Sequence, residues 1–177
     1  MTFFFNYFAC PDNLEGVASV LSWPEKVNRF NRLMRECGRI GMTEIKTLCD
    51  CVRQTAYDIH VYHGHGHLEK VYENALANRL NKAGLRVKQQ HPVNVYDEDG
   101  TPIGEYFADL FVEDSLIVEL KTARALGAEH EAQTIGYLKS SRIEHGPLIN
   151  FGSYKFEIRK YAWSEMLQNE KARQCAM

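Results

Sequence analysis

The spacing of apolar residues changes along the chain from a helical period to a strand period and back. Apolar residues three and four apart predict a helix at residues 44–62 and a second at 68–83, with Gly84 as its C-terminal cap. The apolar stripe expected on the second helix is Leu68, Val71, Tyr72, Ala75, Leu76, Leu80 and Ala83. Strands are expected at 86–96, 103–112, 116–121, 147–151 and 155–161, with a third helix at 129–140. This order predicts an α/β fold, a mixed sheet flanked by helices.

Residues 1–41 have weaker periodicity than the remainder, and Trp23-Pro24 breaks them. Either they are an over-long reading frame with Met42 as the natural start, or they form a genuine N-terminal helical arm. We expect one domain at residues 42–163, followed by a helical, peripheral tail at 164–177.

The composition of the chain limits the binding partners and the cellular compartment that we expect. A net charge of −2 argues against a broad basic surface, so a nucleic-acid ligand would need a local cluster of Lys and Arg, with metal ions offsetting acidic groups. We see no apolar run of roughly 20 residues and no secretion signal, and the five cysteines contain no CxxC pair. We therefore expect a cytoplasmic protein with free thiols and no membrane contact.

The most informative stretch is a pair of apolar strands that carries three charges. If residues 113–115 form the loop of a hairpin, Asp109 lies opposite Glu119 and Phe107 opposite Lys121, with opposed Cβ atoms roughly 5 Å apart. Two such carboxylates repel each other unless a cation or a proton joins them, and Mg²⁺ (or Mn²⁺) meets that need. Lys121 could orient or deprotonate an attacking water, or stabilise charge on a phosphate. The alternative is an ordinary strand pair with a Glu–Lys ion pair.

Other side chains could complete such a site. Glu69 falls inside the apolar arc of the second helix, where it could be a third acidic metal ligand or simply favour the helix dipole. Gln133 and Tyr137 share one side of the third helix with His130, and could hold a phosphate or position Lys121, or lie on a half-exposed amphipathic face. The run of His60, His63, His65 and His67 could bind Zn²⁺, although a solvated loop is the simpler interpretation.

Several short motifs in order resemble a known family. The stretches are Gly66-His-Leu-Glu69-Lys-Val-Tyr72, Asp109-Leu-Phe-Val-Glu113, Ile117-Val-Glu119-Leu-Lys121, His130-Glu-Ala-Gln133, Tyr137-Leu-Lys139 and Leu148-Ile-Asn-Phe-Gly152. Over about residues 44–162 the chain resembles the GxxExxY proteins, which are similar to PD-(D/E)XK nucleases. The resemblance implies a restriction-endonuclease-like fold, with Asp109 and Glu119 as metal ligands, Lys121 as the catalytic lysine and Glu69 as the helix acid. Gln133 and Tyr137 resemble the QxxxY motif of RecB-like nucleases. Ala108 stands where the superfamily name has Pro, and His65 where the family often has Pro.

Two functions follow as hypotheses. The first is a Mg²⁺-dependent nuclease acting on nucleic acid, with DNA as the expected substrate, a role in DNA repair, and a homodimer or protein partner as an open option. The second is a non-catalytic module that binds nucleic acid or protein on a nuclease-like fold.

Overall fold

The computed structural model describes residues 45–164, and the elements found there have the predicted types and order. They are α2 (Ile45–His63), α3 (Glu69–Lys82), β1 (Val87–Tyr96), β2 (Pro102–Val112), β3 (Leu116–Lys121), α4 (Ala128–Ser141), β4 (His145–Asn150) and β5 (Glu157–Ala162). Each end lies within about two residues of its predicted position. The predictions for residues 1–41, and for the tail beyond residue 164, lie outside the described residues.

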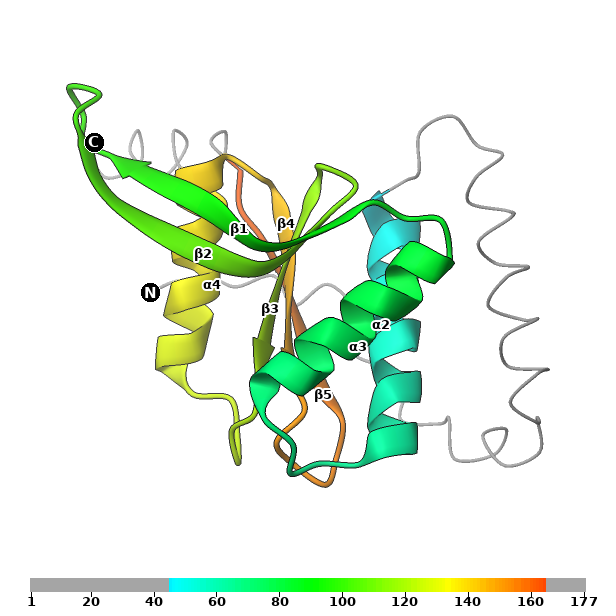
Figure 1. Cartoon of the computed structure of the whole chain (residues 1–177). Coiled ribbons are helices and arrows are strands. Elements are labelled where there is room, and N and C mark those ends of the chain that lie inside the picture. The colour runs from blue at the N-terminus through cyan, green and yellow to red at the C-terminus, as the bar shows by residue number, and fades with distance from the viewer. Residues whose placement is uncertain (1–44, 165–177) are drawn as a thin grey trace.

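The five described strands form one mixed sheet in the order β1-β2-β3-β4-β5. β3 and β4 are parallel, and the other neighbouring pairs are antiparallel. A parallel pair needs a long crossover, which α4 supplies. Helices α2 and α3 lie on one side of the sheet and α4 on the other (Figure 1). The predicted mixed α/β architecture is confirmed.

Each face of the sheet has its own apolar core. The core under α2 and α3 is the larger and includes Leu48, Val52, Ile59, Leu76, Leu80, Leu110, Val118, Leu120 and Phe151. The core under α4 includes Val93, Ala108, Phe111, Ile117, Leu126, Tyr137, Leu138, Leu148 and Tyr161. β3 contributes to both cores because it is central and its side chains alternate between the faces. Within residues 45–164, no helix is long and apolar enough to cross a membrane.

Helix α3 buries a different stripe from the one expected. Leu68 and Val71 are exposed, because Leu68 is the N-cap residue outside the helix and Val71 faces solvent. The stripe is rotated toward Glu73 and Ala77, which are both buried. Gly84 follows the helix with a φ of +89°, in the left-handed conformation predicted for its cap.

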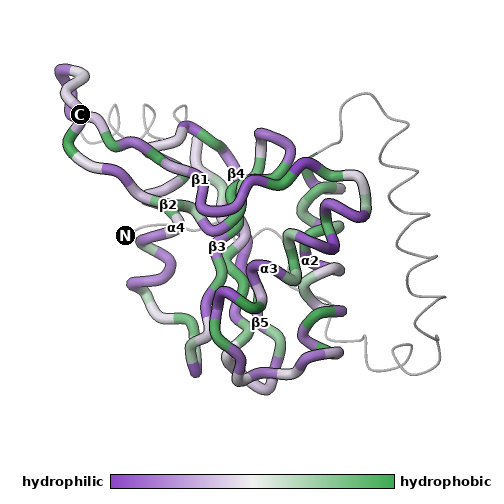
Figure 2. Tube along the Cα trace, viewed as in Figure 1, coloured by the Kyte–Doolittle hydropathy of each residue, from purple (hydrophilic) through white to green (hydrophobic). Residues whose placement is uncertain are grey.

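The β1–β2 hairpin extends beyond the rest of the sheet (Figure 1). In β2, residues 102–107 are exposed and residues 108–112 are buried. The turn at its tip is coloured as hydrophilic in Figure 2, whereas hydrophobic colour recurs along the central strands and the helices α2 and α3. The hairpin therefore has a buried root and an exposed arm, and the boundary falls next to Asp109.

The end of β4 holds the segment that follows Lys121. The Phe151 N–H donates to the carbonyl oxygen of Lys121 at 2.7 Å. Oδ1 of the buried Asn150 accepts from the N–H groups of Ala123 at 3.1 Å and Gly152 at 2.9 Å. Gly152 is packed so closely that a Cβ there would clash with the backbone of Thr122 and Ala123.

We therefore expect Gly152→Ala to lower the free energy of unfolding by about 1–3 kcal/mol, because the backbone after Lys121 would have to move. The control is Gly136→Ala on α4, where a new Cβ meets no atom within 4 Å. Alanine is about 1 kcal/mol more favourable than glycine within a helix, so this variant should be at least as stable as the parent. Urea unfolding of the three proteins measures both effects, and equal midpoints for the two variants would contradict the close packing.

Candidate active site

Asp109 lies where β2 and β3 separate. The two strands pair in the predicted register, at Val112–Leu116, Phe111–Ile117 and Leu110–Val118. Beyond the last of these pairs, the Leu120 N–H donates to Oδ2 of Asp109 at 2.8 Å. A side chain, and not a backbone carbonyl of β2, therefore accepts this hydrogen bond where the strands separate. Phe107, which the hairpin hypothesis placed opposite Lys121, is half exposed and pairs with Pro92 of β1.

Glu119 and Lys121 lie on the same face of β3, as predicted from their spacing. Nζ of Lys121 donates to Oε1 of Glu119 at 2.6 Å. The Glu119 side chain is 2% exposed and that of Lys121 15% exposed. Among the described residues, no donor reaches the other carboxylate oxygen of Glu119, Oε2. A buried carboxylate oxygen without a partner is costly, and it is free to bind a cation or accept a proton.

Helix α3 adds two carboxylates to this region. Glu69, half-buried in its first turn, accepts a hydrogen bond from the Thr122 backbone and lies close enough to Lys121 and Asp109 to interact with their charges. Glu73 is buried, and the sequence analysis missed it. It accepts from Lys70 at 2.6 Å and from Gln89 at 2.9 Å. Its four-residue spacing from Glu69 on one helix face was the signal that could have found it.

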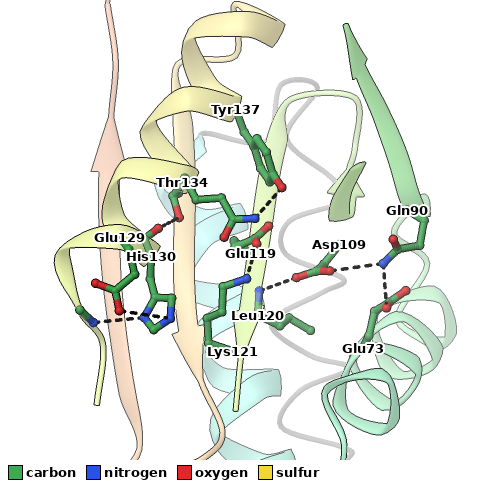
Figure 3. A network of polar contacts seen from close by, with 12 residues as sticks. Glu73, Gln90, Asp109, Glu119, Leu120, Lys121, Glu129, His130, Thr134 and Tyr137 are labelled. Carbon is green, nitrogen blue, oxygen red and sulfur yellow. Dashed lines mark hydrogen bonds and ion pairs between the residues drawn. The ribbon is translucent and has the colours of Figure 1, made fainter. Parts of the chain in front are cut away.

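Gln90 connects this helix to the sheet, and no sequence motif indicated this role. Nε2 of Gln90 donates to Oε2 of Glu73 at 3.0 Å and to Oδ1 of Asp109 at 3.3 Å (Figure 3). Gln90 has a φ of +49°, a left-handed conformation that is unusual for a non-glycine residue within a strand. One amide group thus joins two buried carboxylates.

Helix α4 brings Tyr137 toward the carboxylates from the other side of β3 (Figure 3). Nε2 of Gln133 donates to the Tyr137 hydroxyl at 2.7 Å, which confirms that the two share one side of the helix. His130 has a different role, since its Nδ1 accepts the Gly127 N–H at 3.1 Å at the start of α4. Gln133 therefore reaches this region through Tyr137, and His130 caps the helix.

The electrostatics of the group follow from burial and mutual repulsion. Burial, followed by the charge of Asp109, raises the pKa of Glu119 to about 7. Burial also raises the pKa of Asp109 and of Glu69, although Lys121 opposes both shifts. Burial alone would lower the pKa of Lys121, but the hydrogen bond to Glu119 and the nearby carboxylates outweigh it and raise that pKa. Burial and the charge of Glu119 raise the pKa of Tyr137.

The residues present fit a divalent cation held by few protein ligands. Glu119 offers a buried carboxylate oxygen without a donor, and Asp109 lies close enough for its charge to raise the pKa of Glu119. Within residues 45–164, no three His, Cys, Asp or Glu side chains form a ready-made metal cage, the histidine-rich stretch included. Mg²⁺ is usually held by one or two carboxylates with water and phosphate, so this donor set suits it better than Zn²⁺.

Comparison with known proteins agrees with the sequence motifs. Residues 46–161 match a family model described as the PD-(D/E)XK nuclease superfamily. The predicted resemblance is thereby confirmed at the level of the superfamily, and the mixed sheet flanked by helices is consistent with its restriction-endonuclease-like fold. The narrower GxxExxY assignment stays a prediction. Among solved structures, the chain is similar to the crystal structure of SSO0001, with 15% identity and a TM-score of 0.43, over 81% of this chain and 68% of that one. Comparison with curated proteins gave no match.

The raised pKa of Glu119 predicts a stability that falls as pH rises. The folded protein holds a proton on Glu119 up to about pH 7, whereas the unfolded chain releases it near 4.5, so stability is lost between these values. The total is on the order of 3 kcal/mol. Without divalent ions, Glu119→Gln should gain stability relative to the parent between pH 5 and pH 8, as measured by urea unfolding at both. A constant difference between the two proteins would contradict this assignment.

The bridge at Gln90 predicts an unusual order of stabilities. Gln90→Ala removes the donor shared by two buried carboxylates, which costs about 1–3 kcal/mol, and keeps a Cβ at a left-handed φ. Gln90→Gly loses the same donor but relieves the backbone by about 1 kcal/mol. Glycine should therefore be the milder substitution, the reverse of the usual order in a strand. The control Gln89→Ala loses contacts with Glu73 and Asn74 but none with Asp109, and should cost less.

Proposed function

Because the chain belongs to the PD-(D/E)XK nuclease superfamily, we propose that it is a metal-dependent nuclease that hydrolyses phosphodiester bonds, with DNA as its substrate. The observation that carries the proposal is the arrangement of Asp109, Glu119 and Lys121, two buried carboxylates beside a lysine whose pKa is raised. We assign this activity to residues 42–163 and place it in the cytoplasm.

Asp109 and Glu119 would hold Mg²⁺ or Mn²⁺, and Glu69 would support the metal or one of its waters. In support, burial raises the pKa of all three carboxyls, and a cation would relieve the repulsion between them. When bound, the metal lowers the pKa of a water molecule and neutralises charge on the phosphate.

Lys121 would act as a positive charge rather than as a base. Its raised pKa keeps the ammonium group protonated at neutral pH, and Glu119 orients it at 2.6 Å. A protonated lysine donates hydrogen bonds and offsets the charge that grows on a phosphate oxygen in the transition state. Deprotonation of water by Lys121, the other option that the sequence left open, is disfavoured by the same shift.

Tyr137 and Gln133 would position the substrate from α4. The Tyr137 hydroxyl accepts from Gln133, so its own hydrogen remains available to donate to a phosphate or a water. The pKa of Tyr137 is raised, and the hydroxyl therefore stays neutral at the pH at which the nuclease would work.

The test is cleavage of labelled single-stranded, double-stranded and branched DNA, and of RNA, with Mg²⁺ or Mn²⁺. We expect Lys121→Ala and Asp109→Ala to lower the rate by about 100-fold or more. The first removes a positive charge that would stabilise the phosphate, and the second removes a ligand of the metal that would neutralise it. The control is Lys88→Ala, which removes an exposed lysine paired with Asp114 and should cut at the parental rate.

Circular dichroism should show all of these variants folded. Parental cleavage by Asp109→Ala would disprove the assigned site. A folded parent that binds nucleic acid but cuts none of the substrates with either metal would favour the binding-module hypothesis instead.

A further inference from the structure

Two exposed aromatic side chains precede Asp109 on β2. Tyr106 is 48% exposed and Phe107 49% exposed, whereas the next residue, Ala108, is fully buried. Exposed aromatic rings offer flat faces on which nucleic-acid bases can stack. Asp109 follows two residues after Phe107, about 7 Å along a strand. We call Tyr106 and Phe107 the aromatic pair.

The Tyr106 ring is connected to the candidate active site. Its centroid lies 5.3 Å from that of Tyr137, with the ring planes inclined at 43°. Tyr137 in turn is close enough to Glu119 for the carboxylate charge to raise its pKa. Phe107 projects from the opposite face of the strand, since successive side chains alternate. The aromatic pair therefore presents rings on both faces of β2 at the edge of the site.

Charge indicates which part of a nucleic acid this surface would meet. Asp97, Glu98 and Asp99 are exposed at the hairpin tip, and Glu105 is exposed beside the pair. These carboxylates repel phosphates, so the hairpin is poorly suited to follow a phosphate backbone. Aromatic rings, by contrast, contact the bases themselves, and they stack on bases of any sequence because every base has a π-face.

We propose that Tyr106 and Phe107 stack on unpaired bases next to the cleaved phosphodiester, so that the substrate is single-stranded DNA or DNA with unpaired bases at the cut. This inference rests on the proposed function and names its substrate class. In a duplex each base face is covered by its neighbours, so presenting bases to the rings requires unstacking, which costs a few kcal/mol per base. A single strand offers its base faces at a much lower cost.

The experiment measures binding separately from cleavage. The full chain is titrated in EDTA with a short fluorescent oligodeoxynucleotide, single-stranded or annealed to its complement, and a 2-aminopurine in the strand reports stacking. We expect the single strand to bind at least tenfold more tightly than the duplex and its 2-aminopurine fluorescence to be quenched. Tyr106→Ala and Phe107→Ala should each weaken single-strand binding by about 5- to 150-fold, which corresponds to about 1–3 kcal/mol for a stacked base.

Two control variants distinguish loss of base stacking from misfolding and from non-specific binding to exposed aromatic side chains. Tyr106→Phe keeps the ring and should bind like the parent. Tyr96→Ala removes an exposed tyrosine nearer the tip of the same hairpin, and should also bind like the parent. Because stacking involves no phosphate, Tyr106→Ala should leave the slope of log affinity against log salt concentration unchanged.

Each contrary outcome has a distinct meaning. Equal binding of single strand and duplex, or equal loss in Tyr106→Ala and Tyr96→Ala, overturns the inference even if the chain cleaves DNA. A parental dimer that Tyr106→Ala converts to a monomer in sedimentation also overturns it, and assigns the surface to a second copy. Tight single-strand binding that depends on Tyr106, without cleavage under Mg²⁺ or Mn²⁺, keeps the stacking surface and rejects the nuclease.

Discussion

Two buried carboxylates on neighbouring strands, Asp109 of β2 and Glu119 of β3, are the constraint on which the remaining arrangement depends. Asp109 is 9% exposed and Glu119 2% exposed, and burial together with the charge of Asp109 raises the pKa of Glu119. A single lysine, one backbone N–H and one glutamine amide are the partners that offset this cost. The compensation is incomplete, since one oxygen of Glu119 has no donor among the described residues. Binding of a proton or a cation at this oxygen would therefore stabilise the group.

The separation of β2 from β3 creates the room for this group. Beyond Leu110 and Val118 the Asp109 side chain accepts the hydrogen bond of the Leu120 N–H, so this candidate metal ligand is also a structural acceptor. α3 and α4 then approach from the two faces of the sheet, where Glu73 of α3 accepts from Gln90 of β1 and Tyr137 accepts from Gln133 of the same helix α4. The backbone after Lys121 is fixed by β4 through Asn150 and Phe151. The candidate site thus draws its side chains from α3, β1, β2, β3 and α4.

The sequence predicted the elements well because apolar periodicity and turn residues are local signals. The register of β2 and β3 followed from one loop-length assumption and was confirmed over three pairs. Glu73 was missed because a glutamate beside an apolar stripe resembles an ordinary solvated residue, and its burial depends on contacts with β1 that are distant in sequence. Gln90 was missed because nothing in the residue type reveals a left-handed φ within a strand. Leu68 was wrongly assigned to the helix because the helical spacing of apolar residues extends one residue before Glu69, where the helix begins.

The parallel pairing of β3 with β4 affects the order in which parts of the chain can fold during synthesis. On the ribosome, the hairpin of β2 and β3 emerges complete before α4 and β4 have been synthesised. Pairing across a helical crossover is non-local and therefore slow compared with hairpin closure. Until Asn150 and Phe151 have been synthesised, the segment after Lys121 lacks the hydrogen bonds that hold it. A nascent or truncated chain that ends before β4 thus carries every carboxylate of the candidate site, but the backbone after Lys121 is not yet held against the sheet.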